Sequence, residues 1–95
     1  MLKIIESEQF KRELRTIAFH IKKDKPSASI KFVKNLKIMI NDLANFPYKC
    51  RPSIYFDNSE IRDFIYVGYT VIYEIDKEKD SLKVLSIFNQ NLPDL

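Results

Sequence analysis

The stretch IRDFIYVGYTVIYEIDKEKDSLKVLSIF, residues 61–88, decides the fold because it predicts three successive β-strands. Ile61–Val67 and Tyr69–Ile75 are rich in β-branched and aromatic residues, and Gly68, the chain's one glycine, stands between them. A wholly polar run, residues 76–81, separates the second strand from Leu82–Phe88. Because the connections are short, the strands should form an antiparallel meander. Alternation along the second strand predicts one face made of Tyr69, Val71, Tyr73 and Ile75.

Two amphipathic helices are predicted upstream of these strands. Ser7 is a suitable N-cap, and the helix that follows it should end near Asp24. Pro26 suits the first turn of a second helix, which Pro47 ends. The short connection between the helices predicts an αα-hairpin. The apolar faces consist of Phe10, Leu14, Ile17 and Ile21 in the first helix and of Ile30, Val33, Leu36, Ile40 and Leu43 in the second.

The remaining segments complete a two-layer arrangement. Residues 2–5, Leu-Lys-Ile-Ile, predict a short N-terminal strand, and residues 47–60 predict a loop with a short extended piece at Ser53–Phe56. The element order is therefore β-α-α-β-β-β. The N-terminal strand and helical hairpin should pack on an antiparallel sheet, because the helices must cover one sheet face to bury both apolar stripes. We expect a two-layer α+β fold in one domain over residues 1–95.

Composition limits the classes of protein that the chain can represent. It has 95 residues, 45% of them hydrophobic, with 16 Lys and Arg against 13 Asp and Glu. The charge is uneven, +6 over residues 1–50 and −3 over residues 51–95, so the helical half is a candidate surface for an acidic partner. No apolar run approaches the roughly 20 residues that cross a bilayer, and the N-terminus lacks an apolar signal core. We therefore expect a cytoplasmic protein that does not bind membranes.

Most catalytic and metal-binding patterns do not occur in the sequence. His20 is the one histidine, no spacing of His, Cys or carboxylates is typical of a metal site, and no glycine-rich segment can cradle a phosphate. Cys50 stands between Lys49 and Arg51, which is compatible with a reactive thiolate or with an ordinary loop thiol. We expect neither a metal site nor a cofactor.

A basic and aromatic group on the β half has two interpretations. In one, an arginine grips a phosphate bidentately while tyrosine rings stack on bases. In the other, Arg62 is an edge residue paired with Asp63 or Glu60, and the tyrosines are packing residues. The group consists of Arg62, Tyr66, Tyr69 and Tyr73 from the predicted strands and of Lys49 and Arg51 from the preceding loop.

The ordered set of these pieces resembles the RelE/ParE superfamily of toxins from bacterial type II toxin–antitoxin systems. The resemblance covers nearly the whole chain and rests mainly on the strand Ile61-Arg62-Asp63-Phe64 followed by Gly68-Tyr69-Thr70-Val71-Ile72-Tyr73. The helix junction Asp24-Lys25-Pro26-Ser27-Ala28 is more similar to ParE-like members. RelE-like members cut mRNA on the ribosome, whereas ParE-like members poison DNA gyrase. The resemblance implies a cognate antitoxin as partner, with DNA reached only through that antitoxin.

The two activities would use different site residues. For RelE-like cleavage, the candidates for catalysis are Arg62, Arg51, Lys49, Tyr66 and Tyr73. Many members carry a His or Tyr and one or two Arg after the last strand, where this chain has Phe88-Asn89-Gln90-Asn91-Leu92. Asn and Gln cannot act as a general acid or base. For binding of a target or an antitoxin, the candidates are Arg62, Lys83, Phe88, Asn89, Gln90 and Asn91.

The sequence therefore predicts the toxin of a type II toxin–antitoxin, or plasmid stabilisation, module that inhibits growth by binding DNA gyrase. Two alternatives stay open. One is a ribosome-dependent mRNA endonuclease of the RelE type. The other is a catalytically decayed scaffold that binds the antitoxin.

Overall fold

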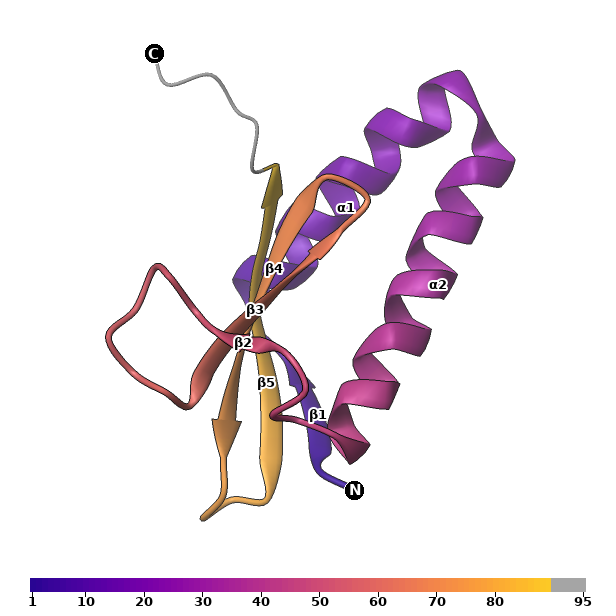
Figure 1. Ribbon diagram of the computed structural model, residues 1–95. Coiled ribbons are helices and arrows are strands. Elements are labelled where there is room, and N and C mark those ends of the chain that lie inside the picture. Colours follow the sequence, from indigo (N-terminus) through magenta and orange to yellow (C-terminus); the bar gives the residue numbers. More distant parts are fainter. Residues whose placement is uncertain (90–95) are drawn as a thin grey trace.

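The computed structural model describes residues 1–89, which form two helices and a five-stranded sheet (Figure 1). The expected order β-α-α-β-β-β is present, with one additional two-residue strand after the second helix. The elements are β1 (Lys3–Glu6), α1 (Glu8–Asp24), α2 (Pro26–Asn45), β2 (Arg51–Pro52), β3 (Ile61–Tyr66), β4 (Tyr69–Asp76) and β5 (Ser81–Asn89).

The strand order in the sheet is β1-β5-β4-β3-β2. Strands β3, β4 and β5 form the expected antiparallel meander. β1 pairs with β5 in parallel, with Lys3 opposite Ser81. The sheet is therefore mixed, whereas the sequence predicted an antiparallel one. A parallel pair needs a long intervening connection, which the helical hairpin and the meander supply here.

The extended segment between α2 and β3 lies earlier than the sequence predicted. β2 pairs antiparallel with the start of β3, whereas residues 54–55 form a turn. The expected strand at Ser53–Phe56 is therefore wrong. Pro52 has no N–H group, which suits it to this outermost strand of the sheet. The loop of residues 53–60 then projects beyond the sheet edge (Figure 1).

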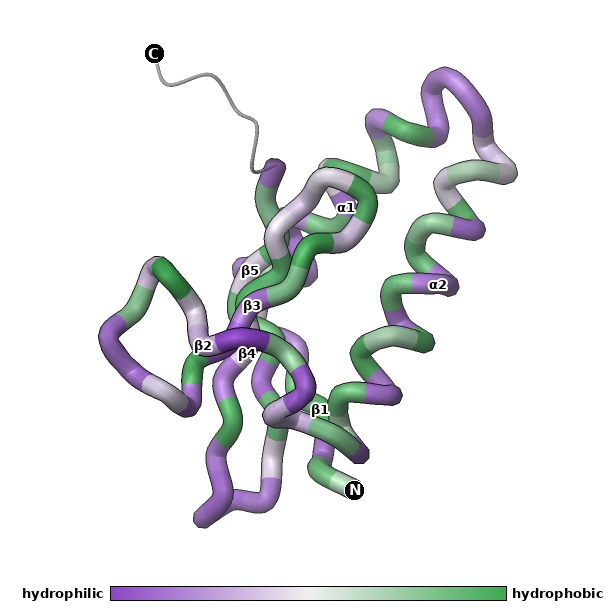
Figure 2. The backbone as a smooth tube through the Cα atoms, viewed as in Figure 1, coloured by the Kyte–Doolittle hydropathy of each residue, from purple (hydrophilic) through white to green (hydrophobic). Residues whose placement is uncertain are grey.

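Both helices cover the same face of the sheet, and hydrophobic residues recur along α2 and the central strands (Figures 1 and 2). The fully buried large side chains come from both layers: Phe10, Leu36, Val71, Tyr73, Leu82 and Val84. Each buried aliphatic side chain contributes about 1.5–3 kcal/mol relative to exposure. The predicted face of β4 is confirmed, because Tyr69, Val71, Tyr73 and Ile75 all pack in this core.

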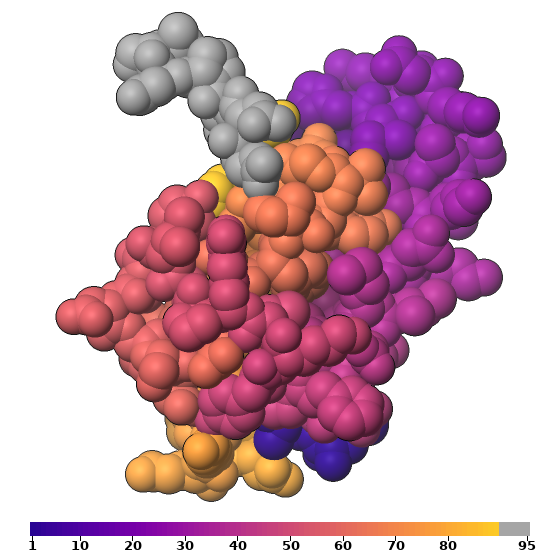
Figure 3. All heavy atoms as spheres, in the orientation of Figure 1, coloured from indigo at the N-terminus to yellow at the C-terminus, as the bar shows by residue number. Residues whose placement is uncertain are grey.

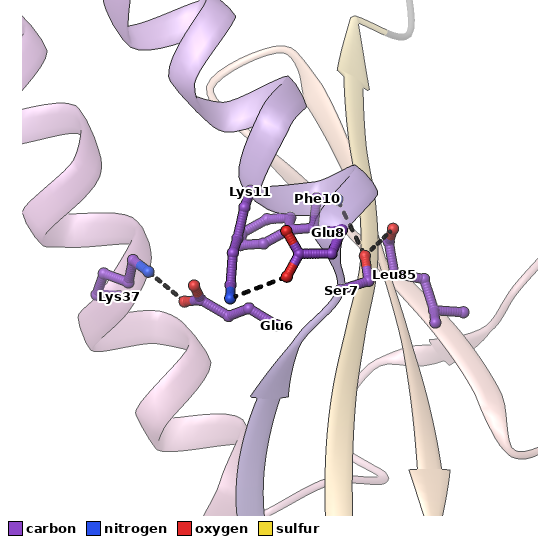
Figure 4. A network of polar contacts seen from close by, with 7 residues as sticks. All are labelled: Glu6, Ser7, Glu8, Phe10, Lys11, Lys37 and Leu85. Atoms are coloured by element: carbon purple, nitrogen blue, oxygen red, sulfur yellow. Dashed lines mark hydrogen bonds and ion pairs between the residues drawn. The ribbon is translucent and has the colours of Figure 1, made fainter.

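The junction of β1 and α1 is fixed by the N-cap that the sequence predicted (Figure 4). The Ser7 hydroxyl accepts a hydrogen bond from the Phe10 amide at 3.0 Å and donates one to the Leu85 carbonyl at 2.8 Å. Glu6, at the end of β1, forms an ion pair with Lys37 of α2. These contacts fix the positions of α1, α2 and β5 around the end of β1.

The turn between β3 and β4 consists of Val67 and Gly68, whose φ angles are both positive, 48° and 83°. Two such residues are typical of the type I′ hairpin turn, whose twist matches that of the flanking strands. A Cβ atom added at Gly68 would meet nothing within 4 Å, so backbone conformation alone favours glycine there. A β-branched residue in the left-handed region, such as Val67, costs roughly 1–2 kcal/mol.

Candidate functional site

Arg62 lies on β3 directly opposite Tyr73 of β4, so its side chain emerges on the sheet face that the helices cover. Its Nε donates to the Ser59 carbonyl at 3.0 Å, and a terminal nitrogen donates to the Cys50 carbonyl at 2.8 Å. The guanidinium carbon lies 4.8 Å from the centre of the Tyr48 ring. Arg62 therefore connects β3 to the loop segments on both sides of β2.

Tyr48 belongs to the same cluster, and sequence reasoning missed it. Its ring contacts Arg62 and, at 5.1 Å, the amino group of Lys77 from the β4–β5 loop. Its hydroxyl donates to the Glu60 carboxylate at 2.5 Å, and its hydrogen bond with Lys77 raises the pKa of that lysine. Glu60 therefore pairs with Tyr48, and not with Arg62 as one interpretation expected. An aromatic residue directly after Pro47 was the one available signal.

Lys49 and Arg51 are each held by a carboxylate of the chain. Lys49 Nζ lies 2.7 Å from the Asp42 carboxylate, and Arg51 Nε lies 2.6 Å from that of Asp63, whose side chain is fully buried. These hydrogen bonds raise the pKa of both basic groups. Because Arg51 occupies the Asp63 carboxylate, the alternative pairing of Asp63 with Arg62 is also wrong.

Tyr66 and Tyr73 donate their hydroxyl protons to backbone carbonyls. The acceptors are Phe32 for Tyr66 and Pro47 for Tyr73, each at 2.7 Å. Burial raises the pKa of both phenols, and a hydrogen bond with the Cys50 side chain adds to the rise at Tyr73. Neither phenol is therefore poised to exchange a proton near neutral pH. Both tyrosines join the segment that contains α2 to the sheet.

The five residues proposed for catalysis do not converge on one position. Arg62 and Tyr73 lie together near the end of α2, whereas Tyr66 contacts Phe32 in the first half of that helix. Arg51 stands opposite Asp63, the neighbour of Arg62 in sequence. Because successive residues of a strand point to opposite faces, Arg51 and Arg62 lie on opposite sides of the sheet. The two arginines are thus not arranged to grip one phosphate.

A second site candidate is an apolar surface on the sheet face opposite the helices, here called the outer-face patch. Phe88 of β5 lies 5.5 Å, edge to face, from the ring of Tyr55, and Ile65 of β3 is 46% exposed. Thr70 of β4 stands between Ile65 and Phe88 in the pairing. The patch is defined here by Tyr55, Ile65 and Phe88, and Ile54 and Phe56, which flank Tyr55 in the sequence, are exposed as well.

The other residues predicted for partner binding lie on β5 or beyond it. Lys83 is exposed, and in the strand register it stands opposite Glu74 of β4. Asn89 ends β5, opposite Tyr69. Gln90 and Asn91 lie outside the described residues.

The segment that follows α2 covers the lower front of the molecule beside that helix (Figure 3). Two cavities lie at the boundary between α2 and this segment. One of about 560 Å³ is lined by Asp42, Phe46, Pro47, Tyr48 and Lys49. A neighbour of about 310 Å³ adds Met39, Cys50 and Phe64. Phe46 and Tyr48 are themselves exposed, so this boundary presents apolar side chains that the core does not use.

Within residues 1–89 the structure gives no support to histidine catalysis, metal binding or a membrane-spanning helix. His20 is exposed near the end of α1, with its ring edge-on to that of Phe19. No three His, Cys, Asp or Glu side chains within residues 1–89 are grouped to hold a metal ion. Over the same residues, neither helix combines the length and the apolar character needed to cross a membrane.

The fold and these surfaces define a class of protein: a small two-layer α+β domain with exposed apolar surfaces outside its core. Residues 4–91 match the family model described as the ParE toxin of the type II toxin–antitoxin system, parDE. The chain therefore belongs to the ParE toxin family, and the resemblance seen in the sequence is confirmed.

Solved structures agree on the fold. One is described as the chromosomal ParDE TA system from P. aeruginosa; it is 15% identical with a TM-score of 0.76, covering 94% of this chain and 96% of that one. Another, a metal-bound toxin from Helicobacter pylori, is 19% identical with a TM-score of 0.66, covering 95% and 96%. A search of curated protein sequences gives no match.

Proposed function

We propose that this chain arrests growth by binding DNA gyrase and that a cognate antitoxin neutralises it in the cytoplasm. Membership of the ParE family supports the toxin role. One observation carries the choice of mechanism: the side chains nominated for catalysis are engaged within the chain, whereas the outer-face patch is exposed and apolar. A surface of that kind suits a protein partner.

The geometry argues against mRNA cleavage as the main activity. Strand cleavage needs cations at the reacting phosphate and a group that exchanges a proton at neutral pH. Arg51 and Arg62 point to opposite sheet faces, and Lys49 is paired with Asp42. The pKa of Tyr73 is raised by burial. A binding mechanism needs none of these groups to be free.

We place the target contact on the outer-face patch and the adjoining end of β5. Phe88 is its aromatic anchor, since aromatic residues dominate the energy of many protein interfaces. Asn89, which ends β5, supplies a polar contact beside this anchor, and Lys83 extends the contact toward the start of β5. Gln90 and Asn91 stay predicted partner-binding residues outside the described part of the chain. In this proposal Arg62 has a positioning role, because it holds the loop segments that flank the patch.

The test compares truncations of two apolar side chains, half-buried Phe88 and exposed Ile30. Phe88→Ala removes the proposed anchor, and Ile30→Ala is the control, because Ile30 is 72% exposed on α2 and lies outside the patch. We expect Phe88→Ala to raise the concentration that half-inhibits gyrase supercoiling by about tenfold, as for an interface hot spot. Ile30→Ala should change it less than twofold.

Three outcomes would contradict parts of the proposal. Equal effects of the two variants would remove the patch from the target contact. Wild-type protein that leaves gyrase active, yet cuts mRNA on programmed ribosomes, would replace the mechanism with cleavage. Folded protein that neither arrests growth nor acts in either assay would indicate a decayed scaffold.

A further inference from the structure

Thr70 of β4 has a buried hydroxyl group for which the folded chain provides no partner. The residue is 1% exposed, and its Oγ1 atom is the one buried side-chain nitrogen or oxygen within residues 1–89 that forms no hydrogen bond. Such a group lowers stability, because it has lost its hydrogen bonds to water and gained none in return. Valine has nearly the same shape without this cost, so a threonine at this position needs an explanation.

The hydroxyl lies beneath the outer-face patch. Tyr69 and Val71, the neighbours of Thr70 in β4, pack in the core, so the Thr70 side chain points to the opposite sheet face. On that face Ile65 and Phe88 stand on either side of it in the strand register. Both flanking side chains are apolar, so an ordered water would lack the two to four polar partners that it needs. A partner for this hydroxyl therefore has to come from another molecule.

The outer-face patch can open at Tyr55. The base of its loop is fixed, because the Ser53 amide donates to the Ile61 carbonyl at 2.8 Å. The Tyr55 ring, in contrast, is 49% exposed, leans edge to face on Phe88, and carries a hydroxyl that forms no hydrogen bond within residues 1–89. The ring can therefore leave Phe88 without breaking a hydrogen bond.

We propose that Thr70 is a specificity-determining residue of the target contact: when Tyr55 moves off Phe88, the Thr70 hydroxyl donates a hydrogen bond to a backbone carbonyl of the target protein. A carbonyl suits this role because its oxygen has two lone pairs and can accept a second hydrogen bond while it remains in a helix or a strand. An apolar side chain beside that carbonyl takes the place of Tyr55 against Phe88.

The unpaired hydroxyl also selects against other partners. A surface that covers the patch without offering an acceptor leaves the hydroxyl buried and unpaired, so it binds less tightly than one that supplies the carbonyl. The identity of the target rests on the proposed function, whereas the position and chemistry of the contact rest on Thr70 and its surroundings.

Three substitutions separate the cost of the hydroxyl from its use. Thr70→Val removes the hydroxyl and keeps the shape, so the midpoint of thermal unfolding should rise by about 5 °C. The same change leaves the target carbonyl unpaired, so the concentration that half-inhibits gyrase supercoiling should rise by about tenfold. Thr70→Ser keeps the hydroxyl, and the methyl group that it lacks is already buried in the free protein, so inhibition should stay within about twofold of wild type. Thr16→Val changes the chain's other threonine, which is exposed on α1, and should alter inhibition by less than about twofold.

Growth arrest is a second readout that does not assume gyrase as the target. Thr70→Val should weaken the arrest, whereas Thr70→Ser should preserve it. A more stable Thr70→Val protein that keeps full potency in both assays would overturn the proposal. So would a Thr70→Val protein that gains no stability, because the hydroxyl would then be satisfied in the free chain. Arrest by a wild type that leaves gyrase active would overturn the proposed target alone, and the growth comparison of the two Thr70 variants would still decide the role of the hydroxyl.

Discussion

Replacing Tyr73 with phenylalanine should destabilise the fold without removing the toxic activity. The side chain is fully buried, and its hydroxyl donates to the Pro47 carbonyl at 2.7 Å. Phenylalanine keeps the ring, so the change removes one hydrogen bond and leaves the Pro47 carbonyl without that donor. A net hydrogen bond contributes about 0.5–1.5 kcal/mol, and an unsatisfied partner adds to the loss. We expect a loss of about 1–2 kcal/mol.

Tyr66→Phe is the matched comparison. Its hydroxyl donates to the Phe32 carbonyl at the same distance, but that carbonyl lies inside α2 and can also accept the intrahelical bond. The loss should therefore be smaller, about 0.5–1 kcal/mol. Urea unfolding of the two variants measures the difference. In a domain of this size, 1 kcal/mol corresponds to roughly 4–8 °C in the thermal midpoint.

The pH dependence of stability gives Tyr73 an independent signature. Because burial raises the pKa of its phenol in the folded state, the folded protein holds this proton more tightly than the unfolded chain does. The contribution is complete below the unfolded pKa of about 10 and is lost as the pH rises above it. Tyr73→Phe should therefore flatten the alkaline loss of stability relative to wild type.

Toxicity decides between a structural and a catalytic role for Tyr73. Below its unfolding midpoint, Tyr73→Phe should arrest growth as the wild type does. A stable variant that has lost growth arrest would refute the structural assignment. Such a result would instead assign Tyr73, together with the neighbouring Arg62, to the catalytic site of a nuclease.

Three further substitutions test how the fold is held. Glu13→Ala should cost about 1–2 kcal/mol in urea unfolding, because its carboxylate accepts from the Ser86 hydroxyl at 2.7 Å and from the amide of Ile87 at 3.1 Å; an unchanged midpoint would contradict this. Gly68→Ala should cost about 1 kcal/mol through its positive φ alone, with no clash, so a larger loss would point to an unrecognised contact. Ser7→Ala should lower helix stability by about 1 kcal/mol, and Ser7→Asp should largely restore it.

The helices and the meander could be predicted because local signals and packing agree there. The N-cap at Ser7, the proline that begins α2 and the alternation along β4 each have a physical cause that acts within a few residues. The parallel pairing of β1 could not be predicted in the same way. A four-residue strand carries no signal for its partner, and the choice of β5 depends on where the whole helical hairpin packs.

The candidate site was harder to predict than the fold. The sequence singled out Arg62, Arg51 and Lys49 by residue type, but their partners come from segments 7 to 12 residues away and from opposite sheet faces. Side-chain chemistry showed which groups were able to bind a phosphate, whereas only the fold showed that carboxylates and carbonyls of the chain already held them. Tyr48 was missed because it lies in a loop with no periodic pattern.

Exceptions to local rules gather at one end of the sheet. Val67 has an unfavourable φ, and the buried hydroxyl of Thr70 finds no hydrogen-bond partner within residues 1–89. Thr70 pairs with Ile65 on one side and Phe88 on the other, both in the outer-face patch, and Val67 closes the same hairpin. At the start of α1, by contrast, the Ser7 cap and the packing of Phe10 agree. Natural sequences tend to tolerate such conflicts where function requires them, so this hairpin end is where the target contact should be sought first.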